Sequence, residues 1–270
     1  MTHPVHMQHV PGPAGDLAVH VCGPATGTPV VMTHSILAAS MMWDAQAQLL
    51  ADRGYRVIAV DTRGHGQSAA SAPPYRMDDL VADTVAVMDG LGIAKAHYIG
   101  LSLGGMSGFG LATQHGDRLL SAILCDCRAD MPNDMGAVWN DRMQLARTQG
   151  CSALAMPTLE RWFGAAFLAQ HPALRDAFVR TLSATSVDGF VGCAQAIQGL
   201  DYLAQVDRIA VPTTLIVGAN DGPLPQAMKD LQARIRGSQL VVIDHAGHLP
   251  NIDQPDDFNR ALLAHFAAQG

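Results

Sequence analysis

Charged residues are scarce in this sequence. Only 15% of the 270 residues are Asp, Glu, Lys or Arg, against roughly 25% in an average globular protein, and 49% are hydrophobic. This balance excludes an intrinsically disordered chain and a coiled coil, and it predicts a compact protein with a large core. Only Lys95 and Lys229 are lysines, and the 17 basic residues form no cluster. With a formal net charge of −7, the chain lacks the basic face of a nucleic-acid-binding protein.

Disulfide and metal patterns are missing as well. The five cysteines are an odd number without a CxxC pair, which argues against a disulfide framework or a zinc site and favours a reducing cytoplasm. The histidines His3, His6 and His9 lie close together, but no carboxylate or cysteine joins them at metal-ligand spacing. We expect a frayed, solvated terminus there, and neither a metal nor a cofactor in the protein.

Neither a signal peptide nor a membrane span is indicated. The first residues contain no basic stretch followed by an apolar one. The least polar long stretch, residues 98–112, is interrupted by glycines, which weaken a helix. We therefore predict a cytoplasmic protein that has no membrane partner.

Short apolar runs alternate with longer amphipathic segments in the first half of the chain. Near-continuous apolar runs separated by helices are typical of parallel strands buried on both faces. The alternation predicts an α/β fold with a mostly parallel central sheet and helices on both faces. The expected strands cover residues 17–21, 29–33, 56–61, 96–101 and 119–125, and the expected helices cover residues 43–53, 77–91 and 103–115.

The pattern changes after the strand that ends near Cys125. Strands disappear, and large apolar residues recur with helical spacing at Leu159, Trp162, Phe163 and Phe167. The strand–helix alternation then returns at residues 213–217, 226–235, 240–243 and 256–268. We therefore predict a helical cap, residues 128–206, inserted into a core made of residues 1–127 and 207–270.

The strongest chemical signal is Gly-Leu-Ser-Leu-Gly at residues 100–104. It follows an apolar strand and precedes a helix, which is the setting that a G-x-S-x-G nucleophile elbow requires. A strained turn there would expose the Ser102 hydroxyl beside the free N–H groups of a helix N-terminus. A glycine-rich packing turn is the alternative for the pentapeptide alone, but its strand–turn–helix setting favours a nucleophile.

A serine nucleophile needs a base, and the base needs an orienting acid. In this arrangement the acid and then the histidine follow the serine, each from a later strand end. Asp221 and His248 match that order and placement. Asp126, just past an earlier strand, is an alternative acid, and His245 is an alternative base, although the preceding Gly247 favours His248.

Two backbone amides are candidates for an oxyanion hole. One is the N–H of Leu103, directly after the serine, and the other is the N–H of Ile36, in the loop after the strand at residues 29–33. Each such donor is worth about 10²–10³ in rate because it acts where negative charge develops. We expect the neighbouring His34 to be a hydrogen-bonded structural residue that shapes this loop.

The segment Asp-Thr-Arg-Gly-His-Gly-Gln-Ser at residues 61–68 lacks the third glycine of a dinucleotide fingerprint, and it predicts a surface turn. It also resembles the D-x-R-G-x-G-x-S segment of the α/β-hydrolase superfamily. Together with Ser102, Asp221 and His248, the chain from Val30 to the C-terminus resembles that superfamily. The resemblance implies the α/β-hydrolase fold.

A narrower resemblance is to 3-oxoadipate enol-lactonases. It implies a serine hydrolase that cleaves a carboxylic ester or lactone, a small-molecule substrate, through an acyl-enzyme and without a cofactor. The enol-lactonases tend to carry Asn-Ser-Leu-Gly where this chain has His-Ser-Ile-Leu at residues 34–37, so the exact substrate is not assigned. The segments that carry the resemblance are Met42-Trp43-Asp44-x-Gln46, Glu160-Arg161-Trp162-Phe163, Gly192-Cys193-Ala194-Gln195-Ala196-Ile197, and Asp253-Gln254-Pro255 with Phe258-Asn259.

The helical cap should lie over the nucleophile, because ligands bind at the carboxyl edge of such a sheet. Trp139 and Trp162 are candidate walls of the substrate site, although packing of the cap on the core would also bury them. If the substrate carries a carboxylate, Arg161 is a candidate partner, with Arg128 and Arg142 as alternatives.

Two other functions share these features. A carbon–carbon bond hydrolase uses the same serine triad, and a ligand-sensing protein can keep the fold and the triad without turnover. The sequence does not indicate an oligomeric state.

Overall fold

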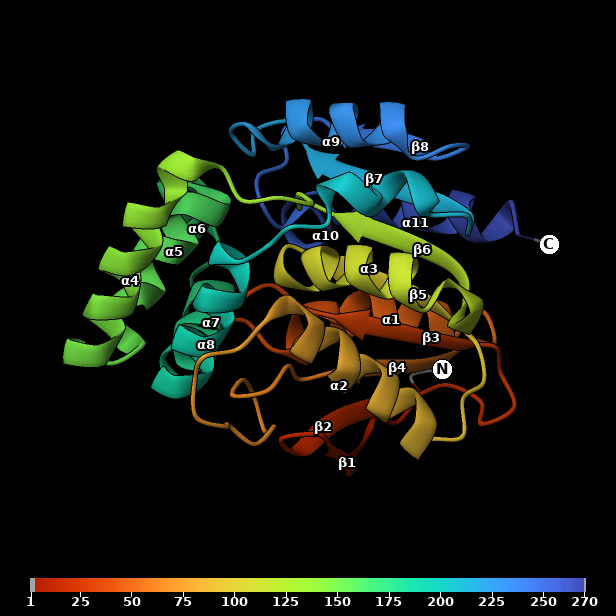
Figure 1. Cartoon of the computed structure of the whole chain (residues 1–270), viewed down its shortest axis with the longest axis horizontal. Coiled ribbons are helices and arrows are strands. Elements are labelled where there is room, and N and C mark those ends of the chain that lie inside the picture. The colour runs from red at the N-terminus through yellow and green to blue at the C-terminus, as the bar shows by residue number, and fades with distance from the viewer. Residues whose placement is uncertain (1–2, 270) are drawn as a thin grey trace.

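The computed structural model describes residues 3–269. Its centre is an eight-stranded sheet in the order β1-β2-β4-β3-β5-β6-β7-β8 (Figure 1). β2 pairs antiparallel with both β1 and β4, and the strands from β4 to β8 are parallel, which confirms the predicted mostly parallel sheet. The strands are β1 (His6–Gly12), β2 (Gly15–Cys22), β3 (Pro29–Thr33), β4 (Arg56–Val60), β5 (Ala96–Leu101), β6 (Leu119–Cys125), β7 (Thr213–Gly218) and β8 (Gln239–Ile243).

The middle of the sheet forms the core. Every residue of β5 and of β7 is buried, as expected of strands covered on both faces. One face is covered by helices that pack on β1, β5, β6 and β7, and the other by helices that pack on β4, β7 and β8. The first group is α2 (Met77–Gly90), α3 (Leu103–Gln114) and α9 (Leu224–Arg234), and the second is α1 (Asp44–Ala51) and α11 (Pro255–Ala267).

Five helices lie between β6 and β7 in the chain and form a cap beyond the carboxyl ends of the parallel strands (Figure 1). The cap is anchored by α8, which packs against α2 and α3. These helices are α4 (Gly136–Gln149), α5 (Ser152–Phe163), α6 (Ala165–Gln170), α7 (Pro172–Ala184) and α8 (Val187–Gln198). Short helical segments complete the fold: η1 (Ser40–Trp43), η2 (Gly116–Arg118), η3 (Asn133–Met135), η4 (Leu203–Arg208) and α10 (Pro250–Asp253).

The apolar spacing in the cap spans two helices and not one. α5 ends at Phe163 because Gly164 adopts a φ of 77°, a left-handed conformation that glycine accepts without a side-chain clash. The chain then restarts as α6, so Phe167 lies on a different helix from Trp162. Periodicity alone cannot detect such a break, since the apolar positions continue in phase across it.

The prediction of a frayed terminus is wrong for His6 and His9. Both lie in β1, which pairs with β2 along its whole length, from His6 opposite Val21 to Gly12 opposite Gly15. Their side chains are exposed, so backbone pairing with β2, together with the buried Val10, orders this segment. His3 lies outside the strand.

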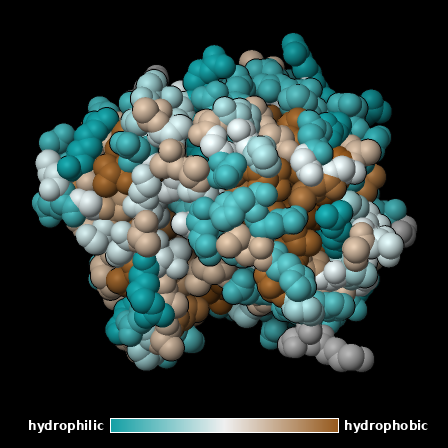
Figure 2. All heavy atoms as spheres, turned by 90° about the horizontal axis from the view of Figure 1, so that it is seen from below, coloured by the Kyte–Doolittle hydropathy of each residue, from teal (hydrophilic) through white to brown (hydrophobic). Residues whose placement is uncertain are grey.

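The surface is mixed in polarity, and in the view of Figure 2 hydrophilic side chains are spread over the face with smaller apolar areas between them. The five cysteines are unpaired and buried. Within residues 3–269, no helix is both long enough and apolar enough to cross a membrane.

Candidate active site

Ser102 occupies the sharp turn between β5 and α3. Its φ of 55° and ψ of −111° are unusual for a residue with a side chain, and they are typical of a strained functional turn. The flanking glycines are a steric requirement. A Cβ on Gly100 would lie 2.3 Å from the Gly104 carbonyl oxygen, and one on Gly104 would lie 2.4 Å from Thr33 Oγ1.

Tyr98, on β5, supports this turn and was not among the residues predicted from the sequence. Its hydroxyl donates to the Gly104 carbonyl oxygen at 2.7 Å, and the Thr33 hydroxyl lies 2.6 Å from it. Burial raises the pKa of Tyr98 to about 12, so the phenol stays protonated and remains a donor. The available signal was a hydroxyl in a mostly apolar strand, just before the elbow.

His248 and Asp221 form a close pair. His248 Nδ1 lies 2.6 Å from Asp221 Oδ2, and both side chains are buried. Burial alone would raise the pKa of Asp221, but the charge and the hydrogen bond of His248 lower it below its ordinary value. His248 Nε2 is buried and has no hydrogen-bond partner among the described residues. The imidazole therefore has one nitrogen held by a carboxylate and the other available to accept a proton.

The sheet brings Ser102 to the same edge as this pair. β5, β6 and β7 are adjacent parallel strands, and the Ser102 amide donates to the Cys125 carbonyl oxygen at 2.8 Å. The next residue, Asp126, has a carboxylate oxygen within 4.8 Å of a ligand atom of both Asp221 and His248. Three segments far apart in the sequence thus meet at one place.

The two alternative residues lie differently. His245 is exposed in the turn after β8, with a φ of 63°, so it does not occupy the position of a buried base. Asp126 is buried, and its Oδ1 accepts the Gly218 amide at 2.8 Å, whereas Asp221 is the acid in contact with the imidazole.

The predicted oxyanion amides lie on two segments that touch each other. The Gly104 amide donates to the His34 carbonyl oxygen at 3.2 Å, which joins the loop after β3 to the start of α3. Leu103 is the first residue of α3, where helix geometry leaves the N–H without a partner. The Ile36 amide donates no hydrogen bond to any residue between 3 and 269. Both amides are therefore free to bind a ligand oxygen.

The loop after β3 is held in an unusual shape. Leu37 has a φ of 68°, in the region that favours glycine, and its carbonyl oxygen accepts the hydroxyl of Thr185 from the cap at 3.1 Å. His34 Nδ1 lies 2.8 Å from the Ser35 carbonyl oxygen, and its Nε2 accepts the Thr62 amide at 2.9 Å. Burial lowers the pKa of His34, so the side chain stays neutral and holds the loop in place through these two hydrogen bonds.

The prediction that residues 61–68 form a surface turn holds for Gly66 and Gln67, which are exposed in a turn, and is wrong for three other residues. Asp61, Arg63 and His65 are all buried. Asp61 accepts the amides of Ser40 and Gln67 at 2.8 and 3.0 Å, and despite burial these bonds and the nearby histidines lower its pKa. The segment therefore packs against the oxyanion loop and bonds to it, a role that the turn-forming residues of the sequence do not indicate.

Hydrogen bonds join residues from opposite ends of the chain. Asn251 Nδ2 donates to the Met42 carbonyl oxygen at 2.8 Å, and Gln46 Nε2 donates to the Asn251 carbonyl oxygen at 3.1 Å. Asp253 Oδ2 accepts the Gly247 amide at 2.7 Å, which fixes the turn before His248. The bonds of Asn251 tie η1 and α1, which follow the oxyanion loop, to α10, which follows the histidine loop.

Trp162 of the cap contacts the histidine directly. Its carbonyl oxygen accepts the His248 amide at 3.0 Å, and its ring stacks on the imidazole with centroids 6.0 Å apart. Trp162 and Trp139 are both buried, and their indole N–H groups have no partner among the described residues. Phe163 and Phe167 stack on each other 5.1 Å apart and pack within the cap.

The three arginines differ in their partners. Arg128 pairs with Asp130 at 3.1 Å. Arg142 donates to Thr158 Oγ1 at 3.0 Å and lies over the Trp139 ring at 5.0 Å, and burial together with the charge of Arg161 lowers its pKa to about 10. Arg161 is exposed to solvent, and the negative charge of Asp221 acts on its guanidinium.

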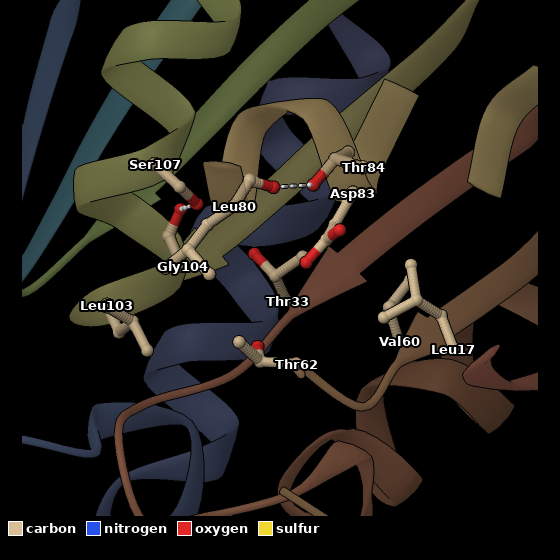
Figure 3. A pocket seen from close by; sticks show the side chains of 10 residues that line it. All are labelled: Leu17, Thr33, Val60, Thr62, Leu80, Asp83, Thr84, Leu103, Gly104 and Ser107. Atoms are coloured by element: carbon tan, nitrogen blue, oxygen red, sulfur yellow. Dashed lines mark hydrogen bonds between the residues drawn. The ribbon is translucent and has the colours of Figure 1, made fainter. Parts of the chain in front are cut away.

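The enclosed cavity behind the elbow is too small for a substrate (Figure 3). Its volume of about 10 Å³ holds no more than one water, and it is lined in part by Thr33, Leu103 and Gly104. A larger groove of about 370 Å³ lies between the start of α2 and η4, and its lining includes none of Ser102, Asp221 and His248.

The chain is similar in sequence and in structure to known alpha/beta hydrolases. A family model described as alpha/beta hydrolase fold matches residues 28–255. The chain is 33% identical to 3-oxoadipate enol-lactonase 2 of Acinetobacter baylyi over 93% of this chain and 94% of that protein. The structure resembles an enol-lactonase from Burkholderia xenovorans (TM-score 0.92, 30% identity, 96% of this chain and 100% of that one). It also resembles a thermophilic esterase from Thermogutta terrifontis with malate bound (TM-score 0.90, 27% identity, 98% and 99%).

Proposed function

The chain belongs to the alpha/beta hydrolase fold family and is a lactone or ester hydrolase, and we propose that it works through an acyl-enzyme formed on Ser102. The observation that carries this proposal is the imidazole of His248, which has Asp221 on Nδ1 at 2.6 Å and a free Nε2. An imidazole held in this way is the base that turns a serine hydroxyl into a nucleophile.

In the first half of the reaction, Ser102 Oγ attacks the carbonyl carbon of the substrate while His248 Nε2 takes its proton. Asp221 holds the tautomer and stabilises the imidazolium. The amides of Leu103 and Ile36 stabilise the negative charge on the tetrahedral oxygen. His248 then gives its proton to the leaving oxygen, and the acyl-enzyme remains.

In the second half, His248 takes a proton from water, which attacks the acyl carbon. The bond to Ser102 Oγ then breaks, and His248 returns the proton to Oγ. When the substrate is a lactone, the leaving alcohol is part of the acyl chain and stays tethered until water releases the product. Retaining the acyl chain requires a cover over the site. The cap can provide it, because its Trp162 contacts His248.

Arg142 and Arg161 favour a substrate that carries a carboxylate. Neither guanidinium pairs with a carboxylate among residues 3–269, unlike Arg128, which is paired with Asp130. The two are close enough for Arg161 to lower the pKa of Arg142. An anion between them would relieve this repulsion and would be bound by charge-assisted hydrogen bonds.

A substrate panel tests the proposal. We expect many turnovers per molecule on lactones or aryl esters and almost none for Ser102→Ala, which should remain folded. Single-turnover labelling would instead indicate a ligand sensor, and turnover of diketones alone would indicate a carbon–carbon bond hydrolase.

The charge preference has its own test. Arg161→Gln and Arg142→Gln should raise KM about tenfold or more for a carboxylate-bearing lactone and leave KM for a neutral aryl ester nearly unchanged. Arg128→Gln is the matched control, because its partner is already Asp130. Equal KM changes on both substrates would remove the arginines from the binding site.

A further inference from the structure

Asp126 lies directly behind the proposed triad, at the end of β6. Its side chain is fully buried, and its φ of 45° is strained for a residue with a side chain. Its amide donates to the Ile216 carbonyl oxygen at 2.9 Å, which pins it to β7. The mechanism above gives this buried acid no role.

The two carboxyl oxygens of Asp126 have different surroundings. Oδ1 accepts the Gly218 amide at 2.8 Å. Oδ2 is buried, and no donor reaches it from any of residues 3–269. A buried carboxylate needs donors to offset its lost hydration, so an ionised Asp126 would carry an uncompensated charge on Oδ2. A proton on Oδ2 converts that oxygen into a donor and removes the problem.

The neighbouring groups decide which acid holds the proton. Two carboxyl groups this close in a buried site do not both ionise. Asp221 has the favourable partners, since His248 contacts it and the positive charge of Arg161 acts on it. Asp126 faces Asp221, Asp253 and the Cys127 thiol, and burial and the charge of Asp221 raise its pKa well above the usual range.

From this geometry, and resting on the proposed triad, we infer that Asp126 is a protonated acid whose Oδ2–H donates a hydrogen bond to the Asp221 carboxylate. It is a positioning residue. The bond supplies Asp221 with a second donor besides His248 and holds the carboxylate in the orientation that the imidazole needs. Asp126 itself does not touch the substrate.

Infrared difference spectroscopy tests the protonation without any measurement of activity. The spectrum of the wild-type protein minus that of Asp126→Asn, at neutral pH, should contain the carbonyl band of a protonated carboxylic acid. Asp244→Asn, which removes an exposed carboxylate in the turn after β8, is the control and should change only carboxylate bands. If Asp126→Asn also changes only carboxylate bands, Asp126 is ionised and the inference is wrong.

Kinetics test the positioning role. An asparagine amide can accept from Gly218 and donate to Asp221, so Asp126→Asn should keep kcat within a few-fold and leave the acid limb of the kcat/KM profile in place. A shift of that limb by about one pH unit would show that a charge had been removed beside His248. Asp126→Ala should lose about 10- to 100-fold in kcat with KM little changed.

Full kcat in a folded Asp126→Ala protein would overturn the positioning role. If that variant does not fold, the infrared spectrum and the Asp126→Asn profile still decide the question. The two hypotheses are tested by separate measurements. Unchanged turnover by Ser102→Ala would contradict the proposed function, and the absence of a protonated-acid band would contradict the inference about Asp126.

Discussion

A single imidazole carries most of the proposed chemistry, and three contacts hold it. Asp221 binds His248 Nδ1, the Trp162 carbonyl accepts the His248 amide, and the Trp162 ring stacks on the imidazole. What matters for the residue that faces His248 Nδ1 is whether it is a hydrogen-bond acceptor. A carboxylate keeps the proton on Nδ1, and an amide in its place would favour the wrong tautomer.

Asp221→Asn should therefore lower kcat by about 10⁴, as the same change does in other triads, and leave the fold intact. Asp126→Asn should cost little, because it retains both hydrogen bonds of a protonated acid. Steady-state kinetics on one ester, with circular dichroism as a check on folding, measure both. The reverse order of effects would make Asp126 the orienting acid.

Leu37 combines backbone strain with a buried side chain. Its φ of 68° costs about 1–2 kcal/mol relative to glycine, whereas loss of a buried leucine costs about 2–5 kcal/mol. Because the second effect is larger, Leu37→Gly should destabilise the protein. Leu37→Ala should be less stable still, since it loses the side chain and keeps the strain. Urea unfolding measures the order, and an alanine variant at least as stable as the glycine variant would contradict the strain.

At the scale of elements, the proposed site is built from turns that follow strands, and close backbone approaches decide which residues those turns accept. A Cβ on Gly218 would lie 2.0 Å from the Gly247 carbonyl oxygen, and a Cβ on Gly247 would lie 2.2 Å from that of Trp162. The cap meets the core in the same way. A Cβ on Gly189, in α8, would lie 2.4 Å from the Gly64 Cα.

Gly189→Ala should push α8 away from the core, lowering the free energy of unfolding by about 1–3 kcal/mol and raising KM. Gly199→Ala, just after the same helix, is the matched control, because its Cβ would lie no closer than 3.6 Å to any neighbour. Thermal unfolding and steady-state kinetics compare the two. Equal behaviour would show that this contact does not hold the cap.

At the scale of the whole molecule, a buried polar chain crosses the edge of the sheet opposite the site. His97 Nδ1 and His265 Nε2 each lie 2.7 Å from the Ser121 hydroxyl, and His265 Nδ1 lies 2.8 Å from Thr214 Oγ1. Burial lowers the pKa of both histidines to about 4. The folded protein therefore keeps them neutral, where they stabilise the packing of α11 on the strands.

The free energy of unfolding should fall as the pH drops from about 6.5 to about 4. In that range the unfolded chain takes up protons on these histidines and the folded chain does not, whereas above about 6.5 neither state is charged. Asp253, whose pKa burial raises to about 6, and the buried Asp126 act in the opposite direction. Burial also lowers the pKa of His34 and that of His65, and both act in the same direction as His97 and His265. Urea unfolding across this range measures the slope, and His265→Gln should reduce it by about one proton. A flat profile for the wild-type protein would contradict the expectation.

The central sheet, the cap and the elbow could be predicted from the sequence because each rests on a local signal: apolar runs, helical spacing, and glycines around a serine. Strand β1 could not, since its pairing with β2 is made by backbone groups and most of its side chains, Val10 excepted, are exposed. The break at Gly164 was also hidden, because apolar positions continue in phase on both sides of it.

The order of residues by itself determined the fold class and which side chains could carry acyl chemistry, since periodicity and strand–turn–helix settings are properties of short segments. Only the tertiary structure decided which acid contacts the imidazole, that Asp61, Arg63 and His65 are buried, and that Tyr98 bonds to the elbow. These outcomes depend on distances between segments far apart in the chain. Burial and hydrogen-bond partners, which set protonation and orientation, exist only once those segments have packed together.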